Sequence, residues 1–79
     1  MKLVWSESSW EDYLYWQNHD KKILKKINSL IKDIKREPFG GLGKPEHLRY
    51  ELAGCWSRRI TDEHRIVYEI DDQNIYIVA

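Results

Sequence analysis

Hydrophobic positions recur at helical spacing through residues 20–36, and the intervening lysines and Asp33 are assigned to the opposite face. The apolar stripe comprises Ile23, Leu24, Ile27, Leu30, Ile31 and Ile34. A period near 3.6 residues predicts an amphipathic helix. Asp20 can cap the N-terminus of this helix, and Pro38 ends it.

The preceding residues favour a strand and then a shorter helix. Lys2–Trp5 is apolar and β-prone, which predicts a strand. Ser6 offers an N-cap for a helix that we expect to end at about Asn18. The apolar residues of this helix recur near helical spacing: Trp10, Tyr13, Leu14 and Trp16.

After a Gly/Pro-rich loop at residues 39–45, the apolar period changes to two. We expect strands over residues 46–52, 55–60, 65–70 and 75–79, joined by turns. This order predicts an α+β fold with an N-terminal strand and two helices packed on one face of a mainly antiparallel, twisted sheet. A chain of 79 residues suffices for one domain, spanning residues 1–79.

Alternation along the late strands assigns residues to the two faces of the sheet. Even positions such as Ile66 and Tyr68 are apolar and should face the helices, so odd positions should face the open side. Arg59 and Arg65 share odd parity on neighbouring strands and should lie close together. Arg49 could join them on the open face.

Composition narrows the class of protein. The four tryptophans fall on apolar stripes, so we assign them to the core. The single cysteine, Cys55, can form no internal disulfide and is expected to be a buried, unreactive thiol. The absence of a signal peptide or a membrane-length apolar run predicts a cytoplasmic protein with no membrane partner. The net charge of zero disfavours a protein that coats nucleic acid but allows a local basic site.

Three arginines on one open face form a candidate anion site, because guanidinium groups suit phosphate. Glu46, at the end of the glycine loop, could act beside them as a general base on a hydroxyl. The alternative is a solvated surface with ion pairs to Glu51 or Glu69. The three histidines lack the spacing of a metal motif, so we expect no metal and no cofactor.

Several separated motifs resemble the YoeB-like toxins of the RelE/ParE superfamily, from bacterial type II toxin–antitoxin systems. The resemblance covers essentially the whole chain, and its most specific parts are Trp10–Trp16, Pro38-Phe39 with Gly43–Glu46, and Trp56–Ile60 followed by Glu63–Arg65. It implies a RelE-like microbial ribonuclease fold. It also implies a ribosome-dependent, metal-independent mRNA interferase, an endoribonuclease that cuts by attack of a ribose 2′-hydroxyl.

The resemblance also implies roles for particular residues and partners. The residue matching Glu46 acts as the general base, and the residue matching Arg65 stabilises charge on the phosphate. Lys44, Arg49 and Arg59 match positions that contact RNA. The implied partners are a cognate antitoxin, messenger RNA and the ribosome, with a homodimer allowed and operator DNA bound only through the antitoxin.

Members of this family carry a His-Tyr pair at the extreme C-terminus, whose histidine protonates the leaving 5′-oxygen, and the present sequence ends at Ala79 without that tail. His64 or His47 could supply the acid instead. The alternative function is a catalytically disarmed module that binds antitoxin and co-represses the operon. A third candidate, a relative that poisons another target such as a topoisomerase, is disfavoured because it needs no base beside a phosphate clamp.

Overall fold

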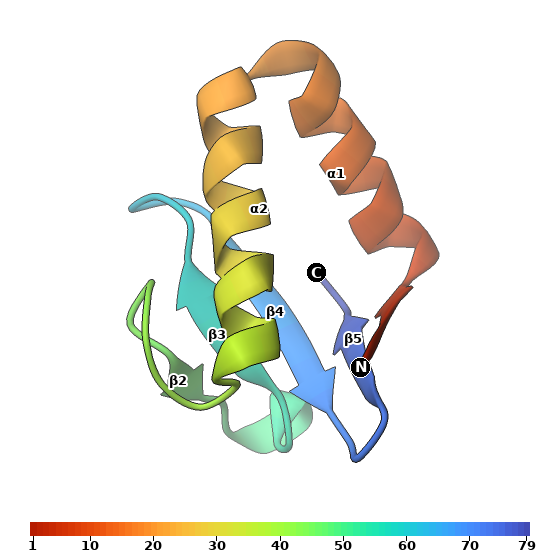
Figure 1. The fold of residues 1–79 in the computed structure, drawn as a ribbon, viewed down its shortest axis with the longest axis vertical. Coiled ribbons are helices and arrows are strands. Elements are labelled where there is room, and N and C mark those ends of the chain that lie inside the picture. Colours follow the sequence, from red (N-terminus) through yellow and green to blue (C-terminus); the bar gives the residue numbers. More distant parts are fainter.

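A five-stranded mixed sheet carries two helices on one face in the computed structural model, which describes residues 1–79 (Figure 1). The elements are β1 (Lys2–Trp5), α1 (Glu7–His19), α2 (Lys21–Arg36), β2 (Glu46–His47), a 3₁₀ helix (Tyr50–Leu52), β3 (Trp56–Arg59), β4 (Arg65–Ile70) and β5 (Asn74–Ile77). The strand order is β1-β5-β4-β3-β2, and only the β1–β5 pair is parallel. The predicted α+β fold with a mainly antiparallel sheet is therefore confirmed.

Both helices begin at the capping residues expected from the sequence. The Ser6 hydroxyl accepts a hydrogen bond from the Ser9 backbone N–H at 3.0 Å. The Asp20 carboxylate accepts from the backbone N–H groups of Lys22 and Ile23, at 3.0 and 3.2 Å. Because α1 ends one residue before Asp20 and α2 starts one residue after it, the two helices form a tight hairpin.

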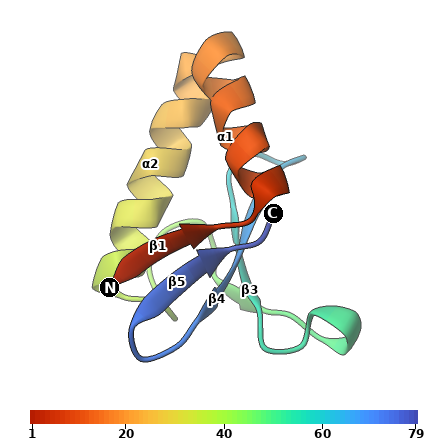
Figure 2. The ribbon, with the colours of Figure 1, turned by 90° about the vertical axis from the view of Figure 1, so that its right-hand side faces the viewer.

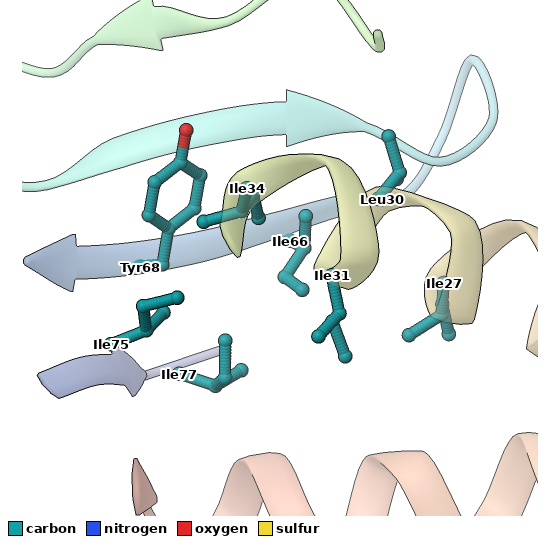
Figure 3. Close-up of a cluster of buried hydrophobic side chains, with 8 residues drawn as sticks. All are labelled: Ile27, Leu30, Ile31, Ile34, Ile66, Tyr68, Ile75 and Ile77. Atoms are coloured by element: carbon teal, nitrogen blue, oxygen red, sulfur yellow. The ribbon is translucent and has the colours of Figure 1, made fainter. Parts of the chain in front are cut away.

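The core is a single layer of side chains between α2 and the central strands (Figure 3). It consists of Ile27, Leu30, Ile31 and Ile34 from α2, and Ile66, Tyr68, Ile75 and Ile77 from β4 and β5. Cys55 is buried as expected, and burial raises the pKa of its thiol. Neither helix is long and apolar enough to cross a membrane.

The assignment of all four tryptophans to the core is wrong. Trp5, Trp16 and Trp56 are half-buried at its margin, and 44% of Trp10 is exposed. The reason is the placement of the helices, because α2 lies across the sheet whereas α1 leans away from it (Figure 1). Isoleucine and leucine fill the space under α2, so the aromatic face of α1 is covered on one side only. Trp10 instead stacks on Tyr13 with ring centroids 5.6 Å apart.

The strand predicted over residues 46–52 is wrong beyond His47. The Leu48 N–H still donates to the Cys55 carbonyl, but Tyr50 then adopts a φ of 61° and starts the 3₁₀ helix. The chain must reverse direction within a few residues to enter β3. The residues after His47 that alternate between apolar and polar therefore form this tight turn instead of continuing the strand. Tyr50 is consequently 91% exposed.

Candidate active site

A carboxylate, a hydroxyl and a guanidinium from three neighbouring strands meet on the open face of the sheet. Glu46 of β2 pairs with Ser57 of β3, and Arg59 of β3 pairs with Arg65 of β4. The Nη1 atom of Arg65 donates to Glu46 Oε2 at 3.0 Å and to Ser57 Oγ at 3.5 Å. The side chains of Arg65 and Glu46 are 44% and 61% exposed, so solvent and a ligand can reach both.

Arg59 and Arg65 lie directly opposite each other, which confirms the expectation from their shared parity. Two like charges at opposed positions of a sheet repel each other. Glu46 offsets one of these charges, whereas Arg59 forms no ion pair. Arg59 therefore remains available to an anion on this face.

The other two sequence candidates differ in their placement. Lys44 lies between Gly43 and β2 and has a φ of 53°, in the left-handed region. Arg49 lies between β2 and the 3₁₀ helix, outside any strand, so strand alternation does not assign its side chain to a face of the sheet. The grouping of Arg49 with Arg59 and Arg65 stays a prediction.

Arg58 is fully buried and anchors the loop that leads to Lys44 and Glu46. Its guanidinium donates to the Asp33 carboxylate, to the Tyr68 hydroxyl and to backbone carbonyls of Glu37, Gly40 and Leu42. Every N–H of a buried guanidinium needs an acceptor, and three of these acceptors come from the loop. Sequence reasoning missed this residue, although its even parity already placed it on the helix-facing side.

Asp33 does not occupy the solvent face of α2, as the helical pattern suggested. It is 9% exposed and accepts hydrogen bonds from Arg36 at 2.8 Å, from the Leu42 N–H at 2.9 Å and from Arg58. These bonds, with that from Arg36 the largest cause, hold the pKa of Asp33 well below its usual range. The glycine loop explains this position, because it folds back over that side of the helix.

Gly41 is required where the loop meets Asp33. Its φ is 100°, and a Cβ atom there would lie 2.2 Å from an Asp33 carboxylate oxygen. A side chain at this position would therefore be strained and would displace the carboxylate that holds Arg58. The glycine-rich stretch thus serves packing around the Asp33–Arg58 pair.

The two histidines considered as acids lie on the helix side. The His64 ring contacts Trp16 at 5.0 Å between centroids and lines a cavity of about 590 Å³ beside α1. The His47 ring stacks on Trp56, also at 5.0 Å. Neither ring hydrogen-bonds Glu46 or Arg65. No group of three or more histidine, cysteine, aspartate and glutamate side chains has a geometry that could hold a metal ion.

Comparison with known proteins establishes the family. The model for "YoeB-like toxin of bacterial type II toxin-antitoxin system" matches residues 5–79. Toxin YoeB of Escherichia coli K12 is 63% identical over 79 residues, which are all of this chain and 94% of that protein. The structure of a YoeB/ParE toxin from Agrobacterium tumefaciens is 52% identical, with a TM-score of 0.96 over 99% of this chain and 93% of that one.

A third relative was solved with a partner. The structure of a heterotetrameric YoeB–YefM toxin–antitoxin complex from Staphylococcus aureus contains a chain that is 48% identical, with a TM-score of 0.94. The similarity covers 100% of the present chain and 92% of that one. The chain described here therefore belongs to the family of YoeB-like toxins of bacterial type II toxin–antitoxin systems.

Proposed function

We propose that this toxin is an endoribonuclease that cuts messenger RNA on the ribosome. The observation that carries the proposal is the Glu46–Arg65 pair, with its 3.0 Å contact on an exposed sheet face beside the unpaired Arg59. A base next to two guanidinium groups fits a reaction in which a hydroxyl loses a proton while a phosphate gains negative charge.

The reaction uses the RNA's own 2′-hydroxyl as nucleophile. The Glu46 carboxylate takes the proton from this hydroxyl, and the 2′-oxygen forms a bond to the adjacent phosphorus. The bond from phosphorus to the 5′-oxygen breaks, and the leaving oxygen takes up a proton. The products are a 2′,3′-cyclic phosphate and a 5′-hydroxyl, while Arg65 and Arg59 stabilise the charge that builds on the phosphate oxygens.

The Glu46–Arg65 ion pair is compatible with this mechanism, because a phosphate can replace the carboxylate as the partner of Arg65. Exposed ion pairs contribute only about 0–1 kcal/mol, so a phosphate can take Arg65 from Glu46 at small cost. The carboxylate is then free to accept a proton. Ser57 lies beneath both groups, where its small side chain leaves room for the guanidinium to cross β3.

Dependence on the ribosome fits the charge of the domain. Its net charge is zero, so it has little general attraction for RNA, and a large complex that presents the substrate would compensate for this. Lys44, Arg49 and Arg59 are the proposed RNA contacts around the reacting groups. The reaction as written requires no metal or cofactor.

The proposed partners are a cognate antitoxin and a second copy of the chain. Relatives from Staphylococcus aureus were solved as a YoeB–YefM heterotetramer and as a YoeB dimer, at 48% identity to this chain. An antitoxin segment that folds over the basic open face would cover Arg59 and Arg65. Operator DNA would be bound through the antitoxin.

A second candidate function is a disarmed module that only binds antitoxin and co-represses its operon. It is favoured by the positions of His47 and His64, whose rings both pack on tryptophans rather than beside Glu46. Primer extension on ribosome-bound messenger distinguishes the two functions. The endoribonuclease proposal predicts discrete cuts with ribosomes and none with free messenger, whereas the binding module predicts no cuts in either case.

A further inference from the structure

Tyr50 combines two unfavourable features that nothing within the chain offsets. It is 91% exposed, although tyrosine usually buries its ring, and its φ is 61°, which is rare for a bulky side chain. Its hydroxyl makes no hydrogen bond, and its ring contacts no other aromatic ring. Strain of this kind is typical of functional positions. The two non-glycine residues with positive φ, Lys44 and Tyr50, stand on either side of β2, which carries Glu46.

The 3₁₀ helix that starts at Tyr50 lies at the rim of the open face. Gly54, two residues after this helix, lies beside Glu69, because a Cβ atom on Gly54 would be 3.9 Å from Glu69 Oε1. Glu69 shares the open face with Arg65, four residues away on β4. In Figure 2 this turn, coloured green to teal, projects beyond β3 on the side away from α1 and α2.

The distance from Tyr50 to the reacting groups is limited by the chain. Tyr50 follows Glu46 by four positions, so their Cα atoms are at most about 14 Å apart. Leu48 lies between them, and its N–H donates to the carbonyl of Cys55, the residue just before β3. An RNA strand with its scissile phosphate at Arg65 therefore brings its neighbouring nucleotides within reach of the Tyr50 ring.

We infer that Tyr50 stacks on an unpaired base close to the scissile phosphate and thereby contributes to the choice of cleavage site. This inference rests on the proposed ribonuclease function. An exposed ring offers its flat face to any base, and stacking on aromatic side chains is the usual way in which proteins hold single-stranded RNA. Preference among bases then follows from stacking strength rather than from hydrogen bonding.

The test measures cleavage of ribosome-bound synthetic messengers that carry one abasic nucleotide, moved step by step past the cleavage site. Tyr50→Ala is expected to raise KM roughly 5- to 150-fold, the range for loss of one base stack. Tyr50→Phe keeps the ring and should cut like the wild type. At one position, the abasic nucleotide should weaken cleavage by the wild type. At that same position it should not weaken cleavage by Tyr50→Ala any further. Tyr15→Ala, which removes another exposed tyrosine on α1, is the matched control and should cut normally.

A stability measurement separates this role from a structural one. Glycine adopts positive φ without strain, so Tyr50→Gly should raise the Tm by a few degrees while it weakens cleavage. The inference is overturned if Tyr50→Ala and Tyr50→Gly both cut every messenger as the wild type does, a result that leaves the ribonuclease function intact. If the wild type cuts no messenger, the ribonuclease function and the inference are both overturned.

Discussion

Arg65 on β4 reaches across β3 to Glu46 on β2, where its Nη1 atom donates to Oε2 at 3.0 Å. The contact joins two strands that are not neighbours and passes over the buried Ser57. It places a carboxylate and a guanidinium on one exposed surface.

Arg65→Ala should impair cleavage far more than folding. The side chain is 44% exposed and its ion pair is weak, so the free energy of unfolding should change by less than about 1 kcal/mol. Loss of a donor to the developing phosphate charge should lower kcat by roughly 10²–10³-fold. Thermal melts and single-turnover cleavage measure the two effects, and comparable losses in both would argue against a catalytic role.

Glu46→Gln should preserve the fold and the binding of RNA while slowing cleavage. The amide is close in size to the carboxylate but cannot take a proton from the 2′-hydroxyl, so we expect a rate lower by roughly 10²–10⁴-fold. Binding to ribosomes loaded with messenger should stay within a few-fold of the wild type. Unchanged cleavage by this variant would remove Glu46 from the mechanism.

Asp33→Asn should destabilise the protein because it leaves the buried Arg58 without its carboxylate partner. Breaking one side of a buried pair is costly, and for a chain of this size we expect the Tm to fall by roughly 10 °C or more. Asp62→Asn, in the exposed turn between β3 and β4, is the control and should melt like the wild type. A Tm within a degree or two of the wild type would show that Asp33 does not anchor Arg58.

The same carboxylate should make stability fall in acid. Because folding lowers the pKa of Asp33, the unfolded chain binds the proton first as the pH drops. Its contribution is therefore complete above the usual aspartate pKa of about 3.9 and is lost progressively below it. Urea unfolding between pH 7 and pH 2 should show a shallower acid limb for Asp33→Asn than for the wild type. Equal slopes of the acid limb in Asp33→Asn and the wild type would contradict the assignment of this pH dependence to Asp33.

A C-terminal tail ending in His-Tyr should accelerate cleavage. The Val67 N–H donates to the Ala79 carbonyl at 3.1 Å, so residues added after Ala79 would begin two positions from Arg65 along β4. A general acid there should raise the rate by roughly 10²–10⁴-fold, and a tail with glutamine in place of histidine is the control. If the extended and original chains cut equally fast, the tail does not supply the proton, and His64→Gln or His47→Gln should slow cleavage by a similar factor if either ring is the acid.

Local signals were enough to predict the helix caps at Ser6 and Asp20, and strand alternation was enough to pair Arg59 with Arg65. Helix capping depends on residues that are close in sequence, and the pairing of the two arginines depends only on the register of one hairpin. The Asp33–Arg58 network could not be predicted, because it forms only when the glycine loop folds back over α2. The exposure of Tyr50 could not be predicted either, since alternation gives no measure of where a strand stops.

The central claim is that the RNA supplies its own nucleophile to the Glu46–Arg65 site. The most direct measurement uses ribosome-bound messengers that carry a single 2′-deoxynucleotide at the position that precedes the cut. We predict that this substitution abolishes cleavage at that bond and that the unmodified messenger yields 2′,3′-cyclic phosphate and 5′-hydroxyl ends. Cleavage of the deoxy-substituted bond at the normal rate would contradict the account.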